Sequence, residues 1–220
     1  MQFNEAQIQA IQHNTGPCMV IAGPGSGKTT VLTHRVRYLI ERYGVNPSDI
    51  LVITFTKAAA EQMKLKFKGL SEGRNSAVTF GTFHAVFFTI LKAAYNYSAH
   101  CIIKPQIQHE FVKDQMCRLE LEYDDENEAV AGVLSEISCV KGEDVNIDEY
   151  ESRCIPPQSF RIMYRAYDDM LVRKHLIDFD DMIVQCRELL MQREDYRRAW
   201  QNKYKYILID EFQDINKAQF

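Results

Sequence analysis

The chain has 220 residues, of which 46% are hydrophobic and 25% are charged, and its formal net charge is −4. This composition is that of an ordinary globular protein, and the length suits one large domain or a domain with a second, smaller one. No apolar run approaches the roughly 20 residues that cross a bilayer, and the N-terminus lacks a basic region followed by an apolar one, so we expect a cytoplasmic protein with no membrane partner.

The first 87 residues alternate between predicted helices and strands. Asn4 is typical of a helix N-cap, and the helix after it is expected to run to about Asn14. The further elements expected here are a strand at 18–22, a helix at 28–43 ended by Gly44, a buried strand at 50–55, a helix at about 58–67 and a strand at 77–80. This order predicts a parallel sheet with helices on its faces, hence an α/β fold.

After Thr82 the pattern indicates helices only, including 157–174 and 178–191. The next strand signal is YKYILID at 204–210, more than a hundred residues after the third strand. Such a gap is too long for a simple crossover and predicts an inserted helical subdomain. We therefore expect an α/β lobe formed by residues 1–87 and 176–220, and an inserted all-helical subdomain at 88–175.

The sequence AGPGSGKT at 22–29 follows a predicted strand and begins a predicted helix. Glycines at alternate positions let successive backbone N–H groups face one point at the positive end of the helix, which suits a polyphosphate. Lys28 would contact the β and γ phosphates, and the Thr29 hydroxyl would bind Mg²⁺. Ala22 stands where the strict pattern has Gly, and it is the smallest replacement. The expected nucleotide-binding residues are Ala22, Gly23, Pro24, Gly25, Ser26, Gly27, Lys28, Thr29 and Thr30.

The predicted strand near the C-terminus ends in Asp210 and Glu211. In a nucleotide-hydrolysing site, Asp210 would hold Mg²⁺ through its coordinated water, and Glu211 would orient or deprotonate the attacking water. An acidic pair at a strand end is by itself equally well read as a solvated surface feature. Together with the glycine-rich loop, it predicts one site with Thr29 and Asp210 as metal ligands and Lys28 and Glu211 as catalytic residues.

Five segments, in order, resemble the N-terminal half of superfamily 1 DNA helicases of the UvrD/Rep/PcrA kind: AGPGSGKT, ITFTKAAAEQM (53–63), TFGTFHA (79–85), DFDDMI (178–183) and IDEFQD (209–214). The resemblance implies a P-loop NTPase with a RecA-like lobe, interrupted by a helical subdomain. It also implies an ATP-dependent 3′-to-5′ helicase that moves on single-stranded DNA and acts at duplex junctions. The family's second lobe supplies arginine fingers, which contribute about 10³ to 10⁵ in rate, so we expect this chain alone to be nearly inactive. We also expect it to be a monomer.

The resemblance also assigns nucleotide contacts outside the loop. Gln7 lies where the family has a glutamine that reads adenine, and a carboxamide can pair with the exocyclic amine and N7 of that base. The same residue stands at the third helical position after Asn4, where it could complete a capping box instead. Gln213, within the acidic motif, is expected to contact the nucleotide.

For DNA, the resemblance points to residues at the ends of two strands. Phe55 and Thr56 leave the second strand at its carboxyl end, and Thr82 and His84 leave the third in the same way, so all four should lie on the rim where an open α/β sheet binds ligands. Alternatives remain for three of them: Phe55 as core, Thr82 as a helix cap and His84 as a satisfied polar group. Lys57 and Ala58 stand where the family commonly has Asn-Lys, which shifts a potential phosphate contact by one residue.

Two further function classes fit parts of this pattern. A phosphotransferase could use the same loop on a small molecule, and a non-catalytic module could sense ATP or bind DNA. Asp178, Asp180 and Asp181 cluster before a predicted helix, and we interpret them as acids favoured by the helix dipole and not as metal ligands.

Overall fold

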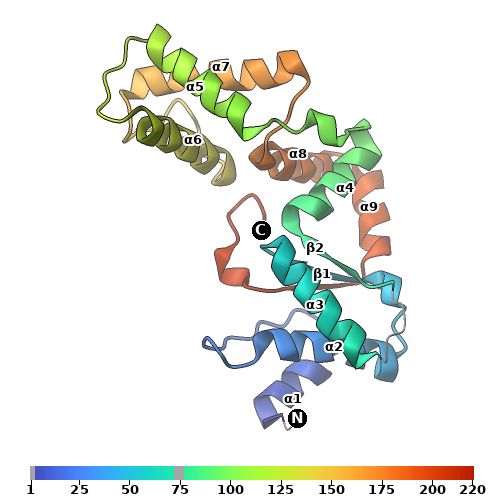
Figure 1. Cartoon of the computed structure of the whole chain (residues 1–220). Helices are drawn as coiled ribbons and strands as arrows, with labels where there is room; N and C mark the ends of the chain where they lie inside the picture. Colours follow the sequence, from blue (N-terminus) through green and yellow to red (C-terminus); the bar gives the residue numbers. More distant parts are fainter. Residues whose placement is uncertain (1–2, 72–76) are drawn as a thin grey trace. The chain divides into compact units, whose positions relative to one another are not determined.

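The computed structural model describes residues 3–71 and 77–220 (Figure 1). Its contacts form two compact units. The α/β unit takes the chain up to Val86 together with Arg193–Asp214, and the helical unit takes Phe87–Gln192 together with Ile215–Phe220. The sequence places the second boundary at 175/176, whereas residues 176–192 and 215–220 make their contacts within the helical unit.

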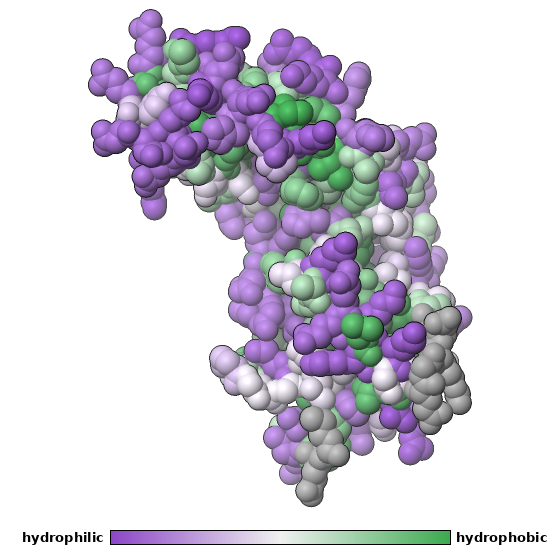
Figure 2. Space-filling model, in the orientation of Figure 1, coloured by the Kyte–Doolittle hydropathy of each residue, from purple (hydrophilic) through white to green (hydrophobic). Residues whose placement is uncertain are grey.

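The face of the molecule drawn in Figure 2 is mostly hydrophilic, with smaller hydrophobic areas between the polar side chains. Among the described residues, no helix is both long enough and apolar enough to cross a membrane.

The sheet of the α/β unit has three parallel strands in the order β2-β1-β3: β1 is Ile50–Thr54, β2 is Thr79–Thr82 and β3 is Tyr206–Ile209. All five residues of β1 are buried, as expected for a central strand with neighbours on both sides. Leu51 pairs with Thr79 on one side and with Ile207 on the other. The α/β class and the parallel sheet expected from the sequence are confirmed.

Helices of this unit are α1 (Glu5–Gln12), α2 (Lys28–Tyr43), α3 (Lys57–Leu70) and α9 (Glu194–Lys203), with short 3₁₀ turns at Pro47–Asp49 and Phe212–Asp214. The apolar stripe of α2 places Val36 and Leu39 in the core, where they pack in one cluster with Met63, Val52 and Leu208. α2 ends at Gly44, whose φ of 65° is in the left-handed region that glycine adopts at helix ends. The predicted helix at 28–43 is therefore confirmed.

The predicted strand at 18–22 is wrong, because these residues form no regular element. Met19, Val20 and Ile21 are 70%, 52% and 91% exposed. A strand exists only through hydrogen bonds to a neighbour, and Pro17 and Pro24 on either side have no N–H to donate. The segment has the apolar composition of a buried strand, but it has no neighbouring strand to pair with among the described residues. The third predicted strand, 77–80, is real but lies two residues later, at β2.

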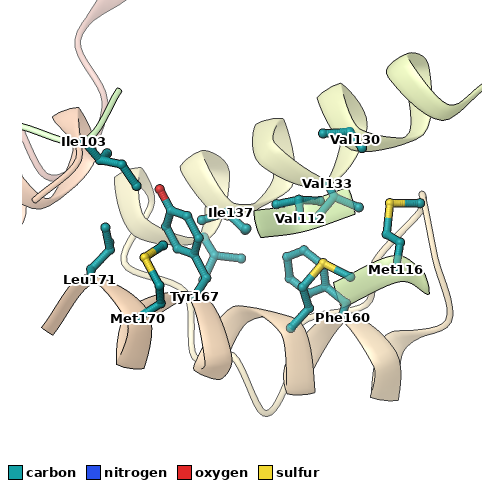
Figure 3. Close-up of a cluster of buried hydrophobic side chains, with 12 residues drawn as sticks. Ile103, Val112, Met116, Val130, Val133, Ile137, Phe160, Tyr167, Met170 and Leu171 are labelled. Carbon is teal, nitrogen blue, oxygen red and sulfur yellow. The ribbon is translucent and has the colours of Figure 1, made fainter. Parts of the chain in front are cut away.

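The helical unit contains most of α4 (Phe83–Tyr95), then a 3₁₀ turn at Ala99–Cys101, α5 (Pro105–Arg118), α6 (Glu126–Gly142), α7 (Pro157–Lys174) and α8 (Phe179–Gln192). Its core is drawn in Figure 3, where side chains of α5, α6 and α7 meet. Val112, Val130, Phe160 and Tyr167 are fully buried there. The predicted helix at 157–174 is confirmed.

A buried cluster of charges joins α6, α7 and α8 within this unit. Lys141 is 5% exposed, and its Nζ lies 2.9 Å from Asp178, 2.7 Å from Asp181 and 3.1 Å from Asp168. Asp178 and Asp181 also accept each other's backbone N–H and so cap the start of α8. Burial lowers the pKa of Lys141, but the facing carboxylates of Asp178, Asp181 and Asp168 raise it more, so the lysine stays charged. The acids thus cap α8 and pair with Lys141, a contact that the sequence pattern did not predict.

Candidate functional site

The register of the sheet brings three chain segments to one edge. Thr54 pairs with Thr82, and Ile53 pairs with Ile209, so the three strands end side by side. The N–H of Asp210 donates to the carbonyl of Ile53 at 2.9 Å, which continues the ladder by one residue. The residues that follow the strands therefore leave the sheet at its carboxyl edge, where open α/β sheets bind their ligands.

The glycine-rich loop opens directly into α2. Gly25 and Gly27 have φ values of 74° and 86°, which side chains with a Cβ rarely adopt, and Gly27 is the N-cap residue of the helix. Ser26 Oγ donates to the carbonyl of Gly23 at 2.7 Å and tightens the turn. A Cβ built at Gly23 or Gly25 meets no atom within 4 Å. The backbone of the loop is thus open to a ligand at the positive end of a 16-residue helix.

Lys28 joins this loop to the acidic motif. Its Nζ donates to the carbonyl of Ala22 at 3.3 Å and lies 3.8 Å from Oε2 of Glu211. Burial raises the pKa of Asp210, and the charge of Glu211 raises it further, whereas the charge of Lys28 lowers it. Asp210 is 8% exposed. The loop and the acidic pair therefore share one electrostatic site, although nearly the whole chain separates them in sequence.

The backbone of Glu211 is in an uncommon conformation, with a φ of 51°. Two contacts hold this residue: Gln213 Nε2 donates to its Oε2 at 2.8 Å, and the N–H of Asp214 donates to its carbonyl at 3.0 Å. Strained backbone of this kind persists only where its surroundings fix it, and it concentrates at functional sites. Gln213, expected as a nucleotide contact, binds the Glu211 carboxylate here, which its motif position alone did not indicate.

Gln7 combines a capping role with a loop contact. Its Oε1 accepts the N–H of Asn4 at 3.0 Å, while Asn4 Oδ1 accepts the N–H of Gln7 at 2.8 Å, which completes a capping box. Gln7 Nε2 donates to the carbonyl of Ser26 at 3.0 Å. The carboxamide thus lies against the loop, so the capping and nucleotide roles weighed from the sequence are compatible in position.

Thr29 and Thr30 occupy the first turn of α2 and are half-buried. Their carbonyls both accept the hydroxyl of Thr33, at 3.1 and 2.9 Å. Among the described residues, no group of three or more His, Cys, Asp or Glu side chains could hold a metal by itself. Mg²⁺ is commonly held by one or two protein oxygens together with substrate phosphates and water. The Thr29 hydroxyl and the Asp210 carboxylate are the two oxygens that the sequence predicts to bind it.

The residues expected to bind DNA lie at or just after the C-terminal ends of β1 and β2. Thr56 Oγ1 accepts the N–H of Ala59 at 3.1 Å and is the N-cap of α3, a role that the sequence analysis missed although Thr is a preferred cap. Thr82 Oγ1 accepts the N–H of Ala85 at 3.2 Å, as the capping alternative anticipated.

Aromatic and imidazole groups lie beside these caps. The rings of Phe55 and Phe83 meet edge to face with centroids 5.5 Å apart; Phe55 is half-buried and Phe83 is buried. Burial lowers the pKa of His84, which favours the neutral imidazole. Phe55 thus has both packed and accessible surface, so the core and base-stacking interpretations stay open.

A glycine-rich loop at the start of a helix, facing an acidic pair at the end of a parallel strand, defines a RecA-like lobe of the P-loop class. The sequence comparison agrees with this class. The chain belongs to the UvrD/REP helicase N-terminal domain family, which matches residues 3–220.

Known relatives match the chain along its whole length. It is 34% identical over 228 residues to the ATP-dependent DNA helicase Rep of Escherichia coli. This match covers 100% of the present chain and 33% of Rep. The ATP-dependent DNA helicase PcrA of Staphylococcus epidermidis is 31% identical over 230 residues, and the YjcD protein of Bacillus subtilis is 34% identical over 230 residues. The chain covers 30% and 29% of these two proteins, so it spans about a third of the length of such relatives.

Proposed function

We propose that this chain binds MgATP and single-stranded DNA as the N-terminal part of a 3′-to-5′ DNA helicase. The observation that carries this proposal is the 3.8 Å approach of Lys28 to Glu211, which joins the phosphate-binding loop to the acidic motif. Rep and PcrA are ATP-dependent DNA helicases, which supports the same substrates. The division into an α/β lobe and an inserted helical subdomain, a monomeric state and a cytoplasmic location belong to this proposal.

The chemistry follows from the position of each side chain. The N–H groups at the start of α2 and the Lys28 ammonium bind the phosphates, and Gln7 reads the adenine. Thr29 and Asp210 would hold Mg²⁺, which when bound neutralises charge that develops on the phosphates. Glu211 orients the attacking water and accepts its proton, and the Gln213 amide fixes the carboxylate for that role.

The DNA-binding rim in this proposal consists of Phe55, Thr56, Thr82 and His84. Capping leaves the threonine oxygens at the helix ends, where backbone N–H groups also attract phosphate. Helix α3, which begins at this rim, carries exposed lysines at positions 57, 64, 66 and 68. Phosphate contacts of this kind are independent of base sequence and weaken with salt.

The isolated chain is expected to bind MgATP weakly and to hydrolyse it negligibly. Hydrolysis in this family depends on arginine fingers that the resemblance assigns to a second lobe. Release of inorganic phosphate, measured with and without a single-stranded oligonucleotide, tests this. Robust DNA-stimulated hydrolysis that disappears in Lys28→Ala would contradict the expectation, because it would come from this site and not from a contaminant.

Replacing Phe55 with alanine is expected to weaken binding of labelled single-stranded DNA by about 5- to 150-fold, since a base–aromatic stack is worth about 1–3 kcal/mol. The matched control is Phe220→Ala, which removes a phenylalanine that is 90% exposed at the other end of the chain. Fluorescence anisotropy over a salt series supplies the measurement. Unchanged DNA affinity in Phe55→Ala would assign this ring to the core. If the wild-type chain binds no single-stranded DNA, the phosphotransferase alternative is favoured.

A further inference from the structure

The chain crosses from the α/β unit into the helical unit immediately after the acidic motif. Asp214 is the last residue of the α/β unit, and Ile215 begins a segment that makes its contacts in the helical unit. Four residues, 212 to 215, lie between Glu211 and Asn216. The connection between Glu211 and Asn216 is therefore short, with a reach of at most about 3.5 Å per residue.

Residues 215–220 form a closed turn against the C-terminal end of α6. Asn216 and Gln219 each accept the other's backbone N–H with their side chains, at 2.9 and 3.0 Å. The N–H of Ala218 donates to the carbonyl of Gly142 at 3.1 Å, and Ala218 is 5% exposed. The turn is thus tied both within itself and to α6.

Gly142 lets this turn approach the helix closely. A Cβ at position 142 would lie 2.8 Å from Nδ2 and 3.6 Å from Cγ of Asn216, which real Cβ atoms do not tolerate without movement. The Asn216 side chain has little freedom to move away, because its Oδ1 accepts the N–H of Gln219. A glycine in a helix costs about 0.5–1 kcal/mol relative to alanine, and close packing of residues 215–220 gives a physical reason for it here.

We infer that Gly142 is a positioning residue for the acidic motif: through Asn216 and Ala218, the helical unit holds the chain that leaves Glu211. The hydrogen bonds of Gln213 and Asp214 to Glu211 both come from one short turn, and residues 215–220 would add a further constraint on the uncommon backbone of Glu211. This inference rests on the proposed function, in which Asp210 holds Mg²⁺ beside the nucleotide. Gly142 itself touches neither nucleotide nor metal in this scheme.

The test is Gly142→Ala in the 220-residue chain, with two readouts. Amide hydrogen exchange of residues 211–214, measured without nucleotide, is expected to rise about tenfold, because release of the turn allows local opening. Affinity for a fluorescent ATP analogue is expected to fall about tenfold with Mg²⁺ and to stay unchanged in EDTA, since the glycine-rich loop is intact. General unfolding would lower both affinities and so cannot imitate this split.

Gly132→Ala is the matched control. It places a Cβ 2.8 Å from Sγ of Cys154 and so strains the same helix, but away from residues 215–220. It is expected to leave both readouts at wild-type values. The double variant Gly142→Ala with Asn216→Ala removes Nδ2 and Cγ and leaves the Cβ of residue 216 at 4.0 Å. We therefore expect its hydrogen exchange at 211–214 and its affinity for the ATP analogue to equal those of Asn216→Ala alone.

The outcomes separate the two ideas. Unchanged hydrogen exchange at 211–214 in Gly142→Ala overturns the inference. Raised exchange together with a wild-type affinity for the ATP analogue in Mg²⁺ overturns it as well. An equal response from Gly132→Ala overturns it as well, because any strain in α6 would then suffice. Failure of the wild-type chain to bind the ATP analogue refutes the proposed function and with it the positioning role, while the exchange data still show whether Gly142 holds residues 211–214.

Discussion

The Lys28→Ala variant is expected to bind MgATP about 10- to 100-fold more weakly than the wild-type chain. A hydrogen bond to a charged group contributes about 1.5–3 kcal/mol, and each 1.4 kcal/mol is a factor of ten in affinity. Lys28 is the residue that links the glycine-rich loop to Glu211, at 3.8 Å, and it also lowers the pKa of Asp210. Removing it takes a positive charge from the phosphates and leaves two carboxylates facing them. Calorimetric titration with MgATP measures the change.

Lys57→Ala is the control for this prediction. Lys57 is also a lysine at the start of a helix, but its side chain is 89% exposed and pairs only loosely with Glu61, at 3.9 Å. Its loss is expected to leave MgATP affinity unchanged. Equal weakening in both variants would mean that net charge and not the Lys28 position controls binding, and the P-loop assignment of Lys28 would fail.

The Lys141→Met variant is expected to destabilise the helical unit by about 3–5 kcal/mol, since removing one partner of a buried ion pair leaves uncompensated charge. Three carboxylates face this lysine, and Tyr167 donates to one of them, Asp178, at 3.1 Å. Lys113→Met is the control: its ion pair with Glu126, at 2.6 Å, is in the same unit but on the surface, where such pairs contribute little to stability. Urea unfolding, monitored by hydrogen exchange of amides in α6, α7 and α8, gives the free energy of unfolding of the helical unit in both variants.

The effect of Lys141→Met should shrink as the pH falls. In the wild type, burial and the charge of Asp178 raise the pKa of Asp181 to about 6, although Lys141 lowers it. A carboxyl whose folded-state pKa is raised stabilises the fold when protonated, and this stabilisation is lost as the pH rises through the folded-state pKa. Without Lys141 the pKa of Asp181 rises further, so the variant should recover stability between pH 7 and pH 5. A deficit that is constant over this range would contradict the role of Asp181.

Elements whose evidence is local were predictable from the sequence. The helix at 28–43 has an apolar stripe and a terminal glycine, and β1 has an unbroken buried run, so both agree with the structure. The segment 18–22 has the same apolar character but forms no strand. Composition reports burial preference, whereas a strand also depends on a partner far away in the chain. The boundaries between the two units were harder to predict for the same reason. Residues 176–192 belong to the helical unit because α8 contacts α6, and their own sequence pattern does not indicate this.

The candidate site divides in the same way. The proximity of Lys28 to Glu211 agrees with the single site expected from the two motifs, although only the acidic motif follows a strand of the sheet. Side-chain partners did not follow: Gln213 binds Glu211, and Thr56 caps α3. Lys141 was missed because a single lysine near the end of an apolar helix usually lies in solvent. Its position among Val133, Ile137 and Val140 was the available signal.

The pairing of β1 with β3 constrains how the newly made polypeptide matures. Ile50 is the partner of Tyr206, so the central strand of the sheet has one open side until the ribosome has synthesised residues 206–209. Helices α5, α6 and α7 are neighbours in sequence and acquire their core long before that point. During translation the inserted helices should therefore become compact first, while the exposed edge of β1 is the surface that chaperones would need to shield from aggregation.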